Sequence, residues 1–162
     1  MVHRPVSTPD FPAEGGCDCK AVRYRMSTKP MFVHCCHCTW CQRETGSAFV
    51  LNALIETGRV DVIAGKPDIV HTPSQSGRGQ QIARCPGCMI ALWSTYSFPT
   101  VKFVRVGTLD KPNLCPPDVH IFTDSKQEWL KLPPGALSFP EYYDSSRYWP
   151  PESLARRAAA MR

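Results

Sequence analysis

Cysteine is the residue type that carries most of the chemical information in this chain of 162 residues, which has nine of them. Seven of the nine occur in three short groups: Cys17 and Cys19; Cys85 and Cys88; and Cys36, Cys38 and Cys41. Thiolates that are two or three residues apart on a turn are typical ligands of zinc. The sequence therefore predicts metal binding.

The two pairs predict a structural metal site. Gly15-Gly16 precedes Cys17, and Pro86-Gly87 separates Cys85 from Cys88, so each pair lies on a turn-forming sequence. Together the pairs can complete a tetrahedral four-thiolate zinc site, which is closed to further ligands. We expect this site to tie the first strand to the middle of the chain and to contribute folding free energy. The alternative is that one pair consists of unrelated buried thiols.

The third group, in the string HCCHCTWC, predicts a catalytic site. Cys36, Cys38 and Cys41 supply three thiolates from one loop and the following turn, which leaves the fourth tetrahedral position open for water or substrate. A zinc ion in such a site acts as a Lewis acid and binds an incoming thiol as its thiolate. The hypothesis is therefore thiol chemistry.

Other arrangements of this group remain open. His34 or His37 could supply a fourth ligand and make the site structural, although His37 lies awkwardly between two ligands. Cys35 could replace Cys36, or the thiols could be redox-active without metal. Cys115 stands alone in NLCPPD, and we expect it to be an ordinary free thiol.

The composition is that of a globular protein without an export signal. Hydrophobic residues make up 43% and charged residues 20%, no run of about 18 apolar residues occurs, and the N-terminal residues contain no apolar segment typical of a signal peptide. We expect a cytoplasmic, reducing location, where cysteines bind metal rather than form disulfides; a secreted disulfide scaffold is the alternative. The net charge is +5, but Lys and Arg are scattered, so we expect neither a nucleic-acid nor a membrane partner.

The elements that position the cysteines are expected to be short. The chain has 16 prolines and 10 glycines, which favour strands joined by tight turns. Apolar patterns predict strands at 21–26, 31–35, 47–55, 59–64, 90–95, 101–106 and 119–123. One helical turn is expected at 38–44, ending at Gly46, and a polar loop at 74–81. We predict a mainly β fold in three parts: an irregular arm at 1–14, a zinc domain at 15–132, and a Pro- and Tyr-rich extension with a short helix at 133–162.

The order and spacing of the cysteine groups resemble those of the glutathione-dependent formaldehyde-activating (GFA) enzymes, a family that includes the centromere protein V-like domain. The strings that carry the resemblance are GGCDCKAVRYR, CHCTWCQRETGSAF, ARCPGCMIALW and VGTLDKP, followed by P-x-x-H and Trp129. The resemblance implies an Mss4-like β-tent of short antiparallel strands around a structural zinc. It implies that the two pairs are the structural ligands and that the third group is the catalytic site, with two zinc ions per chain. It also implies that formaldehyde is joined to glutathione, a carbon–sulfur lyase activity.

Several residues around these sites are singled out as well. Gly46, Ser47 and Phe49 follow the third group and are expected to line its substrate pocket, which Trp129 could cap; plain packing is the alternative for Phe49 and Trp129.

Two residues depart from the family pattern beside the pairs. Lys20 follows Cys19 where the family has glycine, and Met89 follows Cys88 where it has a small residue. We expect the bulky Met89 to alter packing near the structural zinc. These departures bear more on the use of glutathione than on zinc binding.

Three functions follow from this pattern. The first is a zinc-dependent carbon–sulfur lyase or synthase whose partners are a small thiol and a carbonyl compound. The second is a zinc enzyme of specialised metabolism with another carbon–sulfur substrate or a decarboxylation substrate. The third is a non-enzymatic zinc-binding interaction module, which requires a closed second site and a continuous basic face.

Overall fold

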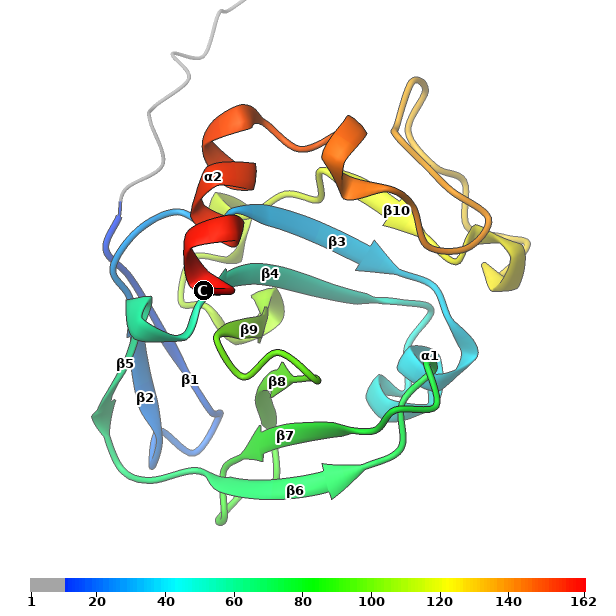
Figure 1. Cartoon of the computed structure of the whole chain (residues 1–162). Helices are drawn as coiled ribbons and strands as arrows, with labels where there is room; N and C mark the ends of the chain where they lie inside the picture. Colours follow the sequence, from blue (N-terminus) through cyan, green and yellow to red (C-terminus); the bar gives the residue numbers. More distant parts are fainter. Residues whose placement is uncertain (1–10) are drawn as a thin grey trace, which may run out of the picture.

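The computed structural model describes residues 11–162, which form two β-sheets and two α-helices (Figure 1). The smaller sheet has the order β1-β2-β5. Its strands are β1 (Ala13–Gly16), β2 (Arg23–Met26) and β5 (Val60–Ala64). The larger sheet has the order β10-β3-β4-β9-β8-β7-β6. Its strands are β3 (Phe32–Cys36), β4 (Val50–Glu56), β6 (Asp68–Thr72), β7 (Gln80–Arg84), β8 (Ala91–Thr95), β9 (Val101–Arg105) and β10 (Val119–Ile121).

The mainly β fold of short strands is confirmed, with one difference in strand direction. Neighbouring strands in both sheets run antiparallel, except that β10 pairs with β3 in parallel. A parallel pair needs a long crossover connection. The residues between β9 and β10 belong to such a connection, which returns the chain to the far edge of the large sheet (Figure 1).

The predicted strands are present with ends shifted by a few residues, but three further strands were not predicted. The strand β1 begins at Ala13, inside the segment expected to be an irregular arm; residues 1–10 lie outside the described residues. The strands β6 and β7 form a hairpin, and β7 begins within the polar loop that was expected at 74–81. The side chains of β6 are mostly exposed, so this edge strand lacks the apolar alternation that marks a strand in sequence.

The first hydrophobic core lies between the two sheets. Tyr24 and Met26 from β2 are fully buried against residues of β4, β8 and β9. The ring of Tyr24 meets that of Trp93 edge-on, with centroids 5.7 Å apart, and the Tyr24 hydroxyl group lies 2.7 Å from the Oγ1 atom of Thr108. This core fixes how the small sheet sits on the large one.

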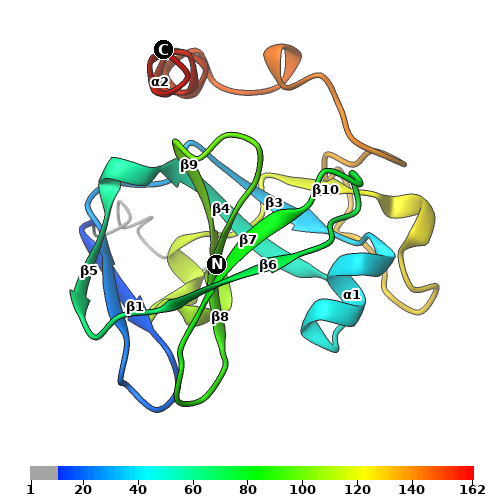
Figure 2. The same ribbon diagram turned by 60° about the horizontal axis from the view of Figure 1, so that its bottom comes forward.

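A second core forms on the other face of the large sheet, beneath the C-terminal extension (residues 133–162). Tyr143 and Trp149 are buried there, and the ring of Trp149 stacks on Phe32 at 5.1 Å. The helix α2 (Pro151–Ala160) follows, and Ser153 Oγ donates a 2.6 Å hydrogen bond to the carbonyl group of Met31. Figures 1 and 2 show α2 and the preceding segment along one side of the large sheet. No helix in the described part of the chain is long or apolar enough to cross a membrane.

Candidate metal centres and the cavity beside them

The two cysteine pairs come together in a four-thiol group. Cys17 and Cys19 follow β1, and Cys85 and Cys88 follow β7. The Sγ atoms of Cys17 and Cys19 are 3.5 Å apart, those of Cys19 and Cys85 are 3.6 Å apart, and all four lie within 4.8 Å of one another. Four sulfur atoms around one zinc ion at tetrahedral angles would be separated by roughly 3.8 Å. The arrangement therefore fits a closed Cys₄ metal site.

Each pair is held by a tight turn that ends in a left-handed residue. The amide of Lys20 donates to the carbonyl of Cys17 at 3.2 Å, and that of Met89 donates to the carbonyl of Cys85 at 2.9 Å. Lys20 has φ 63° and Met89 has φ 62°, a conformation that glycine adopts at least cost. Met89 is 55% exposed, so much of this residue faces solvent beside the thiols.

The third group forms where β3 passes into the helix α1 (Thr39–Thr45), which Gly46 ends with φ 62°. Cys36 closes β3, Cys38 caps the start of α1, and Cys41 lies in its first turn. The Sγ atoms of Cys36 and Cys41 are 3.5 Å apart, and the amide of Cys41 donates to Cys38 Sγ at 3.3 Å. All three thiols are buried and lie within 4.8 Å of one another. The spacing again fits ligands of one tetrahedral ion.

The electrostatics of the three thiols by themselves favour a single thiolate, on Cys38. The hydrogen bond from Cys36 lowers the pKa of Cys38 to about 3, and the same contact raises the pKa of Cys36. Although its hydrogen bond with Cys36 lowers it, contact with Cys38 and burial raise the pKa of Cys41 to about 12. Arg105 is buried nearby and donates to Asn52 Oδ1 at 2.6 Å and to Ser94 Oγ at 3.0 Å. Within residues 11–162 its guanidinium group has no carboxylate partner. Arg105 thus supplies a fixed positive charge beside the thiolates.

Neither histidine of the HCCHC string joins the third group. His34 Nε2 lies 2.8 Å from the hydroxyl group of Tyr143, and burial lowers the pKa of His34 to about 3, so that its ring is neutral. His37 Nε2 lies 3.0 Å from His120 Nδ1 and 3.5 Å from Cys35 Sγ. Among the described residues no fourth Cys, His, Asp or Glu joins the three thiols in a group whose ligand atoms all lie within 4.8 Å of one another. The protein therefore offers three ligands of these types at this place.

Cys35, His37 and His120 form a separate buried group. Successive residues of a strand point to opposite faces, so Cys35 lies across β3 from Cys36. Burial raises the pKa of Cys35 to about 12, lowers that of His37 to about 4 and also lowers that of His120, so all three groups are neutral near pH 7. His37 contacts both of the others. Their composition would also suit a metal ion. The sequence gives no local sign of this group, because His120 lies 83 or more positions from its two partners.

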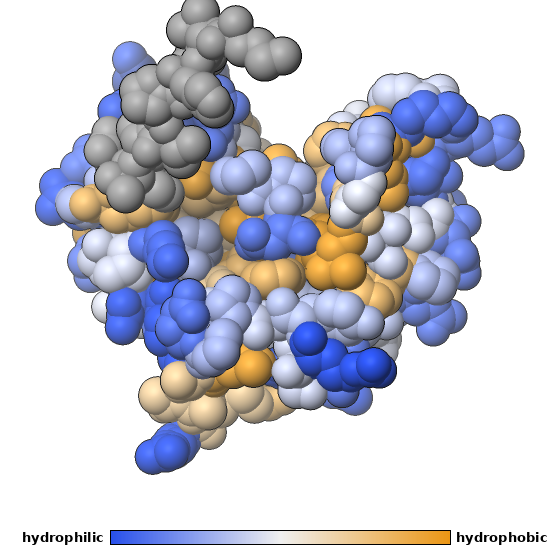
Figure 3. Space-filling view, turned by 90° about the horizontal axis from the view of Figure 1, so that it is seen from above, coloured by the Kyte–Doolittle hydropathy of each residue, from blue (hydrophilic) through white to orange (hydrophobic). Residues whose placement is uncertain are grey.

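A cavity of about 600 Å³ opens above the three-thiol group. Residues of β3, β4 and β9 form its floor, including His34, Asn52 and Phe103. The C-terminal extension forms the opposite wall with the following residues: Glu141, Tyr142, Trp149, Arg157 and Met161. Figure 3 shows hydrophobic surface gathered in the hollow of the face that is seen from above.

The four residues that were expected around a pocket lie elsewhere. None of them lines this cavity. Gly46 and Ser47 are exposed beyond the end of α1, and the ring of Phe49 packs edge-on against His37 with centroids 5.6 Å apart. Trp129 is 68% exposed and donates to Gln127 Oε1. The residues that follow Cys41 continue away from the cavity because α1 carries them past it.

Comparison with known proteins decides the family. The family model described as "Glutathione-dependent formaldehyde-activating enzyme" matches residues 12–125. The chain belongs to this family. A curated GFA relative from Halomonas elongata is 25% identical over 125 residues, which cover 74% of this chain and 80% of the relative. A crystal structure of a Rhodobacter sphaeroides protein covers 60% of this chain and 87% of its own, with 18% identity and a TM-score of 0.44.

The GFA match confirms the resemblance inferred from the cysteine strings. The match also covers only some of the residues that line the cavity. The matched residues include all seven grouped cysteines and the floor of the cavity. The wall formed by Glu141, Tyr142, Trp149, Arg157 and Met161 lies outside the match. Part of the cavity lining of this GFA protein therefore comes from residues outside the family match.

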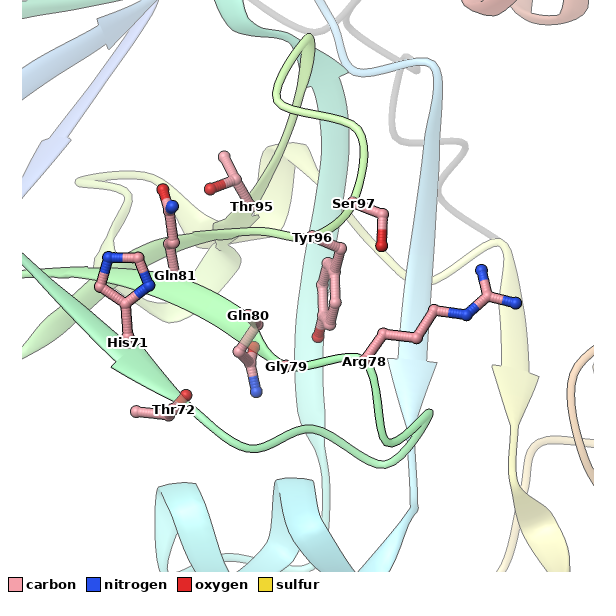
Figure 4. A pocket seen from close by; sticks show the side chains of 9 residues that line it. All are labelled: His71, Thr72, Arg78, Gly79, Gln80, Gln81, Thr95, Tyr96 and Ser97. Atoms are coloured by element: carbon pink, nitrogen blue, oxygen red, sulfur yellow. The ribbon is translucent and has the colours of Figure 1, made fainter.

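A second cavity, of about 360 Å³, lies between the β6–β7 hairpin and the end of β8 (Figure 4). Its lining is polar and includes His71, Gln80, Gln81 and Thr95, but no cysteine. Arg78 lines both cavities, and in Figure 4 its side chain extends away from His71 and Gln81. The second cavity has none of the thiol chemistry of the first.

Proposed function

We propose that this GFA protein is a zinc-dependent carbon–sulfur lyase that joins a small thiol to an aldehyde, or cleaves the adduct, as in the synthesis of S-hydroxymethylglutathione. The observation that carries the proposal is the open three-thiol group on the floor of the cavity of about 600 Å³. In this proposal Cys36, Cys38 and Cys41 are the catalytic ligands. The structural ligands are Cys17, Cys19, Cys85 and Cys88.

The chemistry of the donors supports zinc at both sites. Buried thiolates in tetrahedral spacing select zinc over the harder ions magnesium and calcium, which prefer oxygen. Four ligands close the first site, and three leave the second open, so we assign two zinc ions per chain. A reducing cytoplasm, where thiols and thiol cofactors stay reduced, suits both sites.

The chain's own groups fit the addition of a thiol to a carbonyl. Bound zinc would supply Lewis acidity and would stabilise the substrate thiolate. In the reaction the thiol loses its proton, its sulfur forms a bond to the carbonyl carbon, and the carbonyl oxygen takes up a proton. The buried Arg105 offsets the negative charge of the thiolates. The apolar cavity wall limits access of water, which competes with the thiol for the aldehyde.

The interaction-module hypothesis requires a closed second site. The contacts of His34 with Tyr143 and of His37 with His120 support the open site instead. The hypothesis of a different carbon–sulfur or decarboxylation substrate keeps the same site and depends on what the cavity accepts.

The proposal is tested by measuring whether the protein catalyses the formation and breakdown of the hydroxymethyl adduct of glutathione. Zinc-loaded protein is added to ¹³C-formaldehyde and glutathione, and NMR exchange spectroscopy measures the rate at which the hydroxymethyl adduct forms and breaks. We expect acceleration by the wild-type chain and none by Cys38→Ser. Absence of acceleration with glutathione, cysteine and 2-mercaptoethanol, in a protein shown to hold two zinc ions, would refute the proposal.

A further inference from the structure

Much of the lining of the cavity above the three-thiol group is aromatic. Seven Trp, Tyr and Phe side chains line it: Trp40, Tyr96, Phe98, Phe103, Phe122, Tyr142 and Trp149. Leu54, Val101 and Ile121 add aliphatic surface. A cavity wall of this kind stabilises an apolar ligand by removing its surface from water. Amide and ammonium groups placed against these apolar side chains would lose hydrogen bonds to water without replacing them.

The extension places one positive charge in this apolar wall. Arg157, on α2, is half-buried, and its guanidinium carbon lies 5.4 Å from the ring centroid of Trp149. One Nη atom donates to Ser145 Oγ. Within residues 11–162 Arg157 has no carboxylate partner. Its remaining donors are available to a ligand.

Arg156, which precedes Arg157 on α2, binds a carboxylate group within the protein. Arg156 donates from Nε to Glu56 Oε1 at 2.8 Å and from Nη2 to Glu56 Oε2 at 2.6 Å. Arg156 does not line the cavity, whereas Arg157 does. A carboxylate is the partner that matches the planar donor pair of a guanidinium group.

The other charges of the wall agree with an anionic ligand. Arg78 lines the cavity from the loop between β6 and β7, and Glu141 is its one acidic residue. Both are exposed, and neither side chain has an ion-pair partner in the described part of the chain. Apart from the three thiols on the floor, the lining therefore carries two cations against one anion.

We propose that this cavity takes a monocarboxylate with an apolar body, and that Arg157 binds the carboxylate. The proposal rests on the proposed function, since the reacting sulfur or carbonyl end of such a substrate would lie at Cys36, Cys38 and Cys41. The C-terminal extension, outside the GFA match, thereby sets the substrate class. Glutathione, with two carboxylates, an ammonium and two amides, fits this wall less well than an apolar acid.

The experiment uses ligands without a thiol, so its outcome is independent of metal-bound sulfur. Binding of 4-phenylbutanoate, of its neutral analogue 4-phenylbutanamide and of S-methylglutathione to the zinc-loaded full chain is measured by calorimetry. Arg157→Gln, Arg157→Lys and the matched control Arg156→Gln are compared with the wild type. Thermal unfolding establishes that each variant is folded.

We expect the wild type to bind 4-phenylbutanoate more tightly than both the amide and S-methylglutathione. Arg157→Gln should weaken binding of the acid by about ten- to a hundredfold and leave the amide unchanged, because only the charged hydrogen bonds are lost. Arg157→Lys should recover part of the difference, and Arg156→Gln should retain all of it. Equal affinities of acid and amide, an unchanged acid affinity in Arg157→Gln, or tighter binding of S-methylglutathione would each overturn the proposal. Because no ligand here carries a thiol, any of these results leaves the exchange test of the proposed function standing.

Discussion

His34 Nε2 and the hydroxyl oxygen of Tyr143 lie 2.8 Å apart, and this contact joins β3 to the C-terminal extension. Trp149 Nε1 donates to the same hydroxyl group at 2.6 Å, so this hydroxyl group links both side chains. Nε2 of His34 is thereby engaged, although His34 lines the cavity of the three-thiol group. The extension both encloses the candidate active site and keeps a histidine from closing it.

Removing this hydroxyl group should destabilise the fold. Tyr143→Phe leaves two buried groups, His34 Nε2 and Trp149 Nε1, without their partner, and we expect a loss of about 1–3 kcal/mol in the free energy of unfolding. Denaturant titration of the zinc-loaded protein measures it. Tyr148→Phe is the control: its ring is partly exposed, and we expect a change within about 0.5 kcal/mol. Equal effects of the two substitutions would contradict a structural role for the Tyr143 contact.

The open position of the second site predicts a spectroscopic response. In cobalt-substituted protein, added glutathione or 2-mercaptoethanol should shift the d–d bands and strengthen the sulfur-to-cobalt charge-transfer band, because a thiolate enters the fourth position. His34→Ala and His37→Ala should keep this response and the metal content. If added thiols left the spectrum unchanged and either His variant lost metal, the site would be closed, and this result would favour the interaction-module hypothesis.

The two sites should differ in what their loss does to the fold. Cys85→Ser should unfold or aggregate the chain, since a closed Cys₄ site contributes folding free energy directly. Cys38→Ser should leave a folded chain without thiol chemistry. Thermal unfolding compares them, and equal destabilisation would remove the division into a structural and a catalytic site.

Metal stoichiometry follows from the same division. Native mass spectrometry of protein prepared without chelators should show two zinc ions per chain, and His120→Ala should retain both, because we assign Cys35, His37 and His120 to mutual hydrogen bonding. A third ion that disappears in His120→Ala would place metal in that group. A folded chain without any metal would contradict the zinc assignment itself.

Backbone strain at Met89 predicts a stabilising substitution. Met89 holds φ 62° with an exposed side chain, so Met89→Gly removes the cost of a left-handed non-glycine residue and loses little packing. We expect a gain of about 1 kcal/mol in the free energy of unfolding. Met89→Ala keeps the strain and should leave stability nearly unchanged. If alanine and glycine gave the same stability, strain at this turn would not be the cause.

The sequence by itself determined the family, the mainly β class and the composition of both thiol groups. Most of these features are local: the cysteines of each pair and of the third group lie within six residues of one another on a turn or helix start, and alternation marks strands such as β2 directly. The two pairs are 66 or more positions apart, but two thiolates from each complete one tetrahedral site, which is why they could be expected to combine. Even the left-handed residues Lys20 and Met89 stand at positions where the family resemblance called for glycine or a small residue.

Only the tertiary structure decided which partners distant residues take. The separation of Cys35 from Cys36 depends on the face that each presents from β3, and His37 turns to His120 because β10 pairs beside it. The cavity wall comes from Tyr142, Trp149 and Arg157, more than 100 positions after Cys36 or Cys41, whereas the residues next to Cys41 point elsewhere. Proximity along the chain predicts ligands on one turn, but a cavity is enclosed by whichever segments pack over it, and that packing is set by the whole fold.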